Sequence, residues 1–231
     1  MFFAYIISVI LGYFFGNILT AEIVARIATG KSIFTIGTGN PGMANTMAQI
    51  GFKEGAIVLA GDLAKTVIPC MLVRFVLFPA NGLGASAFAG LGVILGHNYP
   101  IWHKFKGGKG VSATCAAIFC INPPAGLLSM IAGMYVTFFT KYLPVGAVII
   151  PAAFTVFSVL FRKYTVAVIS TVMTLLMFLA HRQGLIGAFK KSEKRVDVIK
   201  NANNKFGKYT SSVFLIISFI SVAGLLFLLV R

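Results

Sequence analysis

Three lysines crowd around a pair of glycines near the middle of the chain, in a segment that we call the second polar loop (residues 98–110). The residues concerned are Lys104, Lys106, Gly107, Gly108 and Lys109. Glycines let backbone N–H groups approach a ligand closely, lysines supply charge, and the helix-like run after Gly110 offers unpaired N–H donors. The pattern predicts a site for an anion such as phosphate. The alternative is a plain cytoplasmic loop, because lysines beside a membrane segment often only fix its orientation.

A glycine-rich segment nearer the N-terminus, the first polar loop (residues 30–45), carries short side chains that suit polyols and phosphate. Its candidate binding residues are Thr38, Gly39, Asn40 and Asn45. The alternative is a simple glycine-rich turn. The sequence G-T-G-N-P-G also fits the dinucleotide pattern, but that pattern requires a βαβ unit, which a loop between two membrane spans lacks.

Two charged residues, Asp62 and Lys65, stand three positions apart inside an apolar run at residues 54–78. Charge within a membrane span is costly, and such residues usually pair and face the interior of the helix bundle. They therefore indicate an intramembrane pair belonging to a functional site. A buried ion pair with a purely structural role is the alternative.

A third polar group, His181 and Arg182, follows a long apolar run. Neither this histidine nor His97 or His103 has a carboxylate or a second histidine three or four residues further on, so no metal site is predicted. The H-x-x-x-x-D pattern of one class of acyltransferases is also absent after all three histidines. No cofactor is expected.

The composition is that of an integral membrane protein. Of the 231 residues, 58% are hydrophobic and 11% are charged, whereas a soluble domain has about a quarter charged. The formal net charge of +15 fits anionic lipids and substrates better than nucleic acid, since no aromatic stacking surface accompanies the cations. The three cysteines form no C-x-x-C pair and are expected to be small core residues.

Hydrophobic runs predict an all-α, polytopic membrane bundle of about seven core helices. The expected segments are 2–28, 54–78, 83–97, 111–121, 124–140, 145–161 and 165–180. The run 111–121 is too short to cross the bilayer alone, so Asn122-Pro123-Pro124 should turn it into a hairpin of two shortened helices. Arg74 is expected to extend towards water at the outer end of its helix.

The distribution of cations predicts the orientation. With the N-terminus outside, 15 of the 20 Lys and Arg residues fall inside, four fall outside, and Lys65 lies in the bilayer. We therefore expect a multi-pass membrane protein with all its polar loops on the cytoplasmic side. Three regions follow: a membrane domain (1–187), a basic cytoplasmic linker (188–208) and an additional C-terminal membrane helix (209–231).

Several motifs give the chain a resemblance to a known family. The run K-F-K-G-G-K-G-V-S-A-T at 104–114, together with Gly96-His97 and Pro100, resembles the acyl-phosphate:glycerol-3-phosphate acyltransferases of bacterial membranes. Further matching motifs are G-T-G-N-P-G-M-A-N at 37–45, Asp62 with Lys65, and His181-Arg182. The likeness covers roughly residues 1–195.

The resemblance implies that a long-chain acyl group passes from acyl phosphate to the 1-hydroxyl of glycerol 3-phosphate, giving lysophosphatidic acid for phospholipid biosynthesis. Lys104 and Lys109 would bind phosphate groups, with Lys106 and the glycine pair beside them. The first polar loop would position the acceptor, and His181 with Arg182 would close the site. Membrane lipids surround the protein, and a separate soluble phosphate acyltransferase would supply the donor.

The chain departs from the family pattern at several positions. Thr38 replaces a serine and Ala48 an arginine, while Gly184 and Gly187 replace Asn and Arg. Two alternatives to a fully active enzyme therefore stay open. One is a catalytically weak or inactive paralogue with another acceptor or a regulatory role. The other is an anion transporter, although transporters typically bind at the bilayer midplane rather than at one face.

Overall fold

The computed structural model describes residues 1–196, and every regular element in that range is helical. The expected C-terminal helix at 209–231 and most of the 188–208 linker lie outside the described residues. The elements are α1 (Phe2–Gly16), α2 (Thr20–Thr29), η1 (Ile33–Thr35), α3 (Met43–Gln49), α4 (Phe52–Met71), η2 (Leu72–Leu77), η3 (Pro79–Asn81), α5 (Gly82–Asn98), η4 (Ile101–His103), α6 (Val111–Ile121), α7 (Pro123–Thr140), α8 (Leu143–Leu160) and α9 (Tyr164–Phe189).

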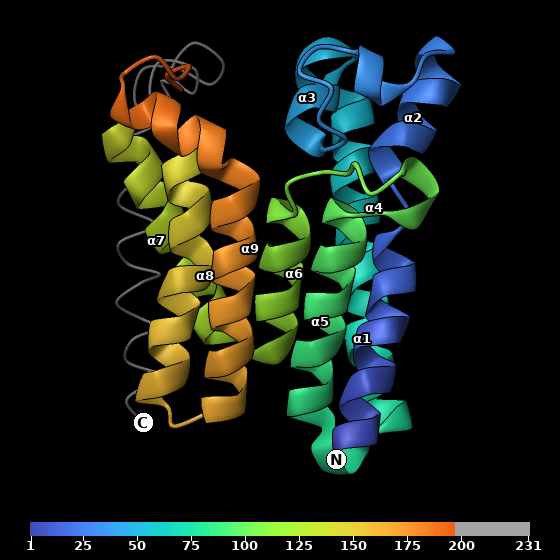
Figure 1. The fold of residues 1–231 in the computed structure, drawn as a ribbon, viewed down its shortest axis with the longest axis vertical. Coiled ribbons are helices and arrows are strands. Elements are labelled where there is room, and N and C mark those ends of the chain that lie inside the picture. Colours follow the sequence, from blue (N-terminus) through green and yellow to red (C-terminus); the bar gives the residue numbers. More distant parts are fainter. Residues whose placement is uncertain (197–231) are drawn as a thin grey trace.

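The long helices run side by side along the longest axis of the molecule (Figure 1). Helices α1, α4 and α5 form one group, α7, α8 and α9 form another, and the short α6 lies between them. Within residues 1–196, six segments are long and apolar enough to cross a membrane, and α6 is a shorter apolar helix. The structure thus confirms the all-α membrane bundle with seven core helical segments.

The predicted hairpin is present as α6 and α7. The Asn122 side chain caps α7, because its Oδ1 accepts a hydrogen bond from the Ala125 N–H at 3.2 Å. Pro123 and Pro124 occupy the first turn of α7, where a missing N–H costs nothing. The expected helix boundaries differ from the observed ones by no more than two residues on either side of the turn.

Arg74 does not extend outwards as expected. Its segment, Leu72–Leu77, is a π-helical turn, and the guanidinium group donates to the carbonyl oxygens of Cys120 and Ile121 at the end of α6. Carbonyl groups at the end of a helix have no partner within that helix and are costly to leave unpaired inside a membrane. Arg74 therefore caps the shortened helix.

Close packing of glycines joins α1 to α5. Both helices carry a G-x-x-x-G spacing: Gly12 and Gly16 of α1 pack on the backbone of α5, and Gly92 and Gly96 of α5 pack on the backbone of α1. A Cβ atom at Gly96 would lie 2.1 Å from the Tyr13 carbonyl oxygen, and one at Gly12 would lie 2.1 Å from a carbonyl oxygen of α5. Only glycine permits this backbone approach, which is a common way to pair membrane helices. It brings the end of α5 against the end of α1.

The first predicted helix, 2–28, is broken into α1 and α2. Leu19 has an extended backbone (φ −85°, ψ 90°), and the Asn17 side chain donates to the Tyr13 carbonyl while its Oδ1 accepts from the Ile101 N–H at 2.6 Å. The break frees the Ile18 carbonyl, which accepts from the Lys65 ammonium group at 2.8 Å. The prediction of one continuous helix was wrong, because the Ile18 carbonyl accepts a hydrogen bond from Lys65 instead of from a backbone N–H of the same helix.

Candidate active site

The polar loops gather at one end of the bundle, opposite the N-terminus (Figure 1). The first follows α2, the second joins α5 to α6, and the turn at Lys141 and the end of α9 lie at the same end. The Phe34 ring of the first loop lies against the His103 imidazole of the second, with 5.4 Å between ring centroids. The structure thus brings together two residues that are 69 positions apart in the sequence.

The second polar loop is a series of tight turns with its lysines on the outside. Lys104 and Phe105 adopt the left-handed conformation (φ 53° and 58°), and the Phe105 N–H donates to the Pro100 carbonyl at 3.0 Å. The side chains of Lys104, Lys106 and Lys109 are exposed. Among residues 1–196, no hydrogen bond or ion pair engages their ammonium groups. Three unpaired like charges on one loop favour the binding of an anion.

The glycine pair of this loop packs against His97. A Cβ atom at Gly107 would lie 2.1 Å from the His97 carbonyl oxygen, and one at Gly108 would lie 2.1 Å from His97 Nε2. The Gly108 N–H also donates to the His97 carbonyl at 2.9 Å. The two glycines are therefore needed so that the loop can lie on the end of α5, which fixes where the lysines stand.

Helix α6 begins at this loop with free backbone donors. Gly110 is its N-cap in the left-handed conformation (φ 75°) and provides no side chain to cap the helix. The Asn98 amide lies beside Gly110, is buried, and makes no hydrogen bond within the described residues. The buried Thr114 hydroxyl is likewise unpaired there. Buried polar groups are normally paired, so this end of α6 offers groups that water or a ligand can satisfy.

The first polar loop is held from inside by Asn45. Its Oδ1 accepts from the Thr38 N–H at 3.0 Å, and its Nδ2 donates to the Ile36 carbonyl at 2.9 Å. Gly39, with φ 69°, turns back so that its N–H donates to the same Ile36 carbonyl. The Thr38 side chain is exposed and Asn40 is half-buried. Asn45 is thus committed to shaping the loop, whereas Thr38 and Asn40 can reach a ligand.

Glu22 on α2 anchors the start of the same loop. One carboxylate oxygen pairs with Arg26 Nε at 2.6 Å, as the i,i+4 spacing suggests. The other accepts from the Ser32 hydroxyl and from the Ile33 N–H, each at 2.9 Å. Glu22 therefore holds the start of the first polar loop to α2.

Asp62 and Lys65 form the predicted pair inside the membrane. Lys65 Nζ lies 2.8 Å from Asp62 Oδ1, and both side chains are about 96% buried or more. Lys65 Nζ also lies 2.8 Å from Nδ1 of His97. The sequence did not indicate this histidine as a functional residue, because its charged partners stand on α4 rather than on its own helix. Its position next to the glycine-rich loop was the available signal.

His181 and Arg182 lie on α9 on the other side of the second polar loop. His181 is buried, its Nδ1 lies 3.1 Å from the Met177 carbonyl oxygen, and the positive charge of Lys109 acts on its imidazole ring. Arg182 is exposed and has no partner among residues 1–196. The structure therefore brings Lys109 and the third polar group to the same region.

The two glycines that depart from the family pattern fit their surroundings on α9. A Cβ atom at Gly184 would lie 2.6 Å from Pro144 Cγ, and one at Gly187 would lie 2.9 Å from a carboxylate oxygen of Glu193. A longer side chain at either position would displace these neighbours. The end of α9 is thus adapted to glycine.

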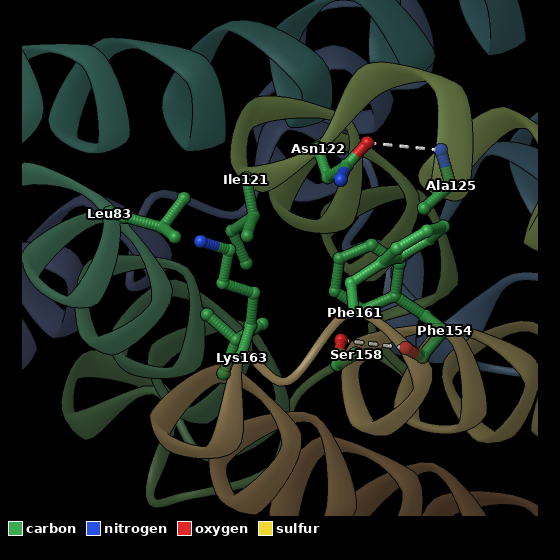
Figure 2. A pocket seen from close by; sticks show the side chains of 9 residues that line it. Leu83, Ile121, Asn122, Ala125, Phe154, Ser158, Phe161 and Lys163 are labelled. Atoms are coloured by element: carbon green, nitrogen blue, oxygen red, sulfur yellow. Dashed lines mark hydrogen bonds between the residues drawn. The ribbon is translucent and has the colours of Figure 1, made fainter. Parts of the chain in front are cut away.

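A cavity of about 40 Å³ opens at the far end of the bundle (Figure 2). Leu83, Asn122, Ser158 and Lys163 are among its lining residues, and all lie at helix ends remote from the polar loops. It has room for a few water molecules but not for a substrate. Among the described residues, no group of three or more metal-binding side chains occurs.

These features define a multi-pass membrane protein whose glycine-rich and lysine-bearing loops lie at one end of the bundle. Residues 6–191 match the family described as glycerol-3-phosphate acyltransferase, and the chain belongs to this family. A relative from Lactobacillus johnsonii, glycerol-3-phosphate acyltransferase 1, is 38% identical over 203 residues, which are 88% of this chain and 98% of the relative. A Clostridioides difficile relative of the same name is 30% identical, with 84% and 96% of the two chains covered.

Solved structures agree with this assignment. The crystal structure of PlsY (YgiH), an integral membrane glycerol 3-phosphate acyltransferase, in its glycerol 3-phosphate form has a TM-score of 0.75 and 26% identity to this chain. The likeness covers 83% of this chain and 95% of that one. The same protein in its lysophosphatidic acid form gives a TM-score of 0.73.

Proposed function

We propose that this protein transfers a long-chain acyl group from acyl phosphate to the 1-hydroxyl of glycerol 3-phosphate, giving lysophosphatidic acid. Membership of the family supports glycerol 3-phosphate as the acceptor. The relative from Lactobacillus johnsonii, which this chain matches over nearly its whole length, carries the name of that activity. The observation that carries the assignment is the loop of exposed lysines, whose ammonium groups have no partner within residues 1–196, next to the N-terminus of α6, which has no side-chain cap. Both substrates are anions, and this is where anions would bind.

Lys104 and Lys109 bind the phosphate groups in this proposal. Their ammonium groups are exposed and unpaired among residues 1–196, and Gly107 and Gly108 let the loop lie flat on α5. Lys106 adds charge to the same loop. On α9, Arg182 and the buried His181 stand near Lys109 and close the site from the opposite side.

The first polar loop positions the acceptor. Thr38, Gly39 and Asn40 contribute a hydroxyl, a backbone turn and an amide that suit the hydroxyl groups of a glycerol backbone. Asn45 acts indirectly by holding the backbone of Thr38 and Ile36. The contact between Phe34 and His103 keeps this loop next to the lysines.

The reaction requires little of the protein beyond holding the two substrates in position. The 1-hydroxyl oxygen attacks the acyl carbonyl carbon, a new ester C–O bond forms, and the bond from the acyl carbon to the phosphate oxygen breaks. The leaving phosphate takes the electron pair and can accept the hydroxyl proton. Because the donor is already activated, holding two anions together and neutralising the developing charge are the main contributions.

The site belongs, in this proposal, on the cytoplasmic side of a bacterial cytoplasmic membrane. The excess of Lys and Arg in the loops at that end supports the orientation. Acyl phosphate would come from a soluble phosphate acyltransferase, which supplies the donor to the same face.

The donor assignment is tested with purified protein in detergent or liposomes. Palmitoyl phosphate and palmitoyl-CoA are compared at equal concentration with glycerol 3-phosphate as acceptor. We expect product only from the acyl phosphate, because the sequence lacks the H-x-x-x-x-D pattern that would activate the hydroxyl for attack on a thioester. Comparable rates with the thioester would contradict the assignment of the donor.

A further inference from the structure

A buried cluster of Asp62, Lys65 and His97 lies directly beneath the second polar loop. We propose that Asp62 and Lys65 are positioning residues: they fix the ring of His97, and through it the backbone of the lysine-bearing loop. The benefit to phosphate binding rests on the function proposed above. The positioning itself does not, and it can be measured without substrate.

The contacts of Lys65 determine which nitrogen of His97 carries the proton. The Lys65 ammonium group has three N–H donors and no acceptor. Nζ lies 2.8 Å from each of three atoms, namely Asp62 Oδ1, the Ile18 carbonyl oxygen and His97 Nδ1. The first two can only accept, so the third hydrogen points at Nδ1. His97 is therefore neutral, with its proton on Nε2.

The Asp62 carboxylate keeps the Lys65 amine charged and holds it in position. Its Oδ1 accepts from Lys65 and, at 3.4 Å, from the Thr20 hydroxyl on α2. The same oxygen lies 3.9 Å from His97 Nδ1. Asp62, Lys65 and His97 are all buried, so the carboxylate is the partner that stabilises the ammonium group there. Without Lys65, the carboxylate would attract a proton to Nδ1 and change the tautomer or charge of the histidine.

His97 fixes the position of the second polar loop through two contacts. Its carbonyl accepts from the Gly108 N–H at 2.9 Å. The edge of the ring that carries Nε2 occupies the space of a side chain at position 108, since a Cβ atom there would lie 2.1 Å from Nε2. Within residues 1–196, Nε2 itself has no hydrogen-bond partner. A rotated or displaced ring would push Gly108 away, and Lys109 with it.

The same cluster links the loop to the break in the first helix. Lys65 holds the Ile18 carbonyl, and the preceding residue, Asn17, holds the Ile101 N–H at the start of the loop. The Tyr13 hydroxyl donates to the Tyr99 carbonyl at 2.8 Å. The loop is thus fixed at its beginning by α1 and at Gly108 by His97. Lys65 connects the two attachments, which is why a charge inside the membrane is retained here.

The first test is the tautomer of His97 in protein labelled with 15N-histidine. A His103→Gln/His181→Gln variant leaves His97 as the one histidine, because the chain has three. We expect an unprotonated Nδ1 and a protonated Nε2. A proton on Nδ1 would overturn the proposal, and this measurement does not depend on any variant of the cluster.

The second test removes both buried charges with Asp62→Asn/Lys65→Met, so that no unpaired charge is left in the membrane. We expect hydrogen exchange in peptides covering residues 99–110 to become about ten- to a hundred-fold faster, the range for a lost charged hydrogen bond. The control is Ser86→Ala, which removes from the same helix as His97 a buried hydroxyl that has no hydrogen-bond partner within residues 1–196. Wild-type exchange of the loop in the double variant would refute the proposal.

Kinetics separate this inference from the proposed function. If the wild-type protein acylates glycerol 3-phosphate, the double variant should raise KM for a phosphate-bearing substrate more than it lowers kcat. If the wild type shows no acyl transfer, but His97 carries its proton on Nε2 and loop exchange is faster in the double variant, the function fails and the positioning role stands. Normal activity and normal loop exchange in the double variant would refute the positioning role alone.

Discussion

Replacing Gly108 by alanine tests how the second polar loop is seated. The added Cβ atom would lie 2.1 Å from His97 Nε2, whereas ordinary contacts begin at 3.4 Å. The loop and the ring must therefore separate by about 1.3 Å. A misplacement of about 1 Å at a reactive site can cost about a hundred-fold in rate. We expect kcat/KM for Gly108→Ala to fall by about that factor, while overpacking lowers stability by about 1–3 kcal/mol.

The assay is steady-state acyl transfer by purified protein, with thermal unfolding measured in parallel. Gly84→Ala is the matched control, because a Cβ atom there would lie 2.5 Å from the Tyr5 hydroxyl oxygen, near the start of α5 and remote from the polar loops. The control should lose stability but keep its activity. A Gly108→Ala protein with kcat/KM within about twofold of the wild type would refute the account of loop packing.

Three further predictions concern the charges and the orientation. Lys109→Ala should lower kcat/KM by about ten- to a hundred-fold through loss of a charged hydrogen bond. Lys163→Ala, at the far end of the bundle, should leave the kinetics unchanged. Equal effects of the two substitutions would contradict the placement of the site at the second polar loop. Ala48→Arg should lower KM for glycerol 3-phosphate, because a guanidinium group binds phosphate with two hydrogen bonds; an unchanged KM would show that position 48 does not face the acceptor. An engineered cysteine at the exposed Ser192 should resist impermeant thiol reagents in intact cells, and labelling there would reverse the topology.

The sequence predicted those parts of the fold that composition and local signals determine. The α6–α7 hairpin follows from a short apolar run before Asn122-Pro123-Pro124, and the Asp62 and Lys65 pair follows from charge within an apolar run. Both predictions need only residues that are neighbours in the sequence. The break between α1 and α2 was missed although Gly16 and Asn17 stand at the end of α1, because both lie within one uncharged, largely apolar run. It depends on Lys65, which lies 47 residues away.

For the candidate site, too, the sequence predicted residue types but not contacts between distant segments. The lysines, the glycines and Asn45 were found from residue types and spacing. Their geometry was not, since Gly107 and Gly108 serve to accommodate His97 and Asn45 holds its own loop. His97 was set aside because its helix carries no partner for it. Its partners come from α4, a relation that a single sequence does not reveal.

The most direct test of the central claim is the product formed by the purified wild-type protein. Labelled glycerol 3-phosphate is incubated with palmitoyl phosphate, and the labelled lipid is identified by mass spectrometry together with the position of its acyl group. We predict 1-acyl lysophosphatidic acid and an equal amount of released inorganic phosphate. Hydrolysis of palmitoyl phosphate without acyl transfer, or acylation of another phosphorylated polyol in preference to glycerol 3-phosphate, would contradict the account.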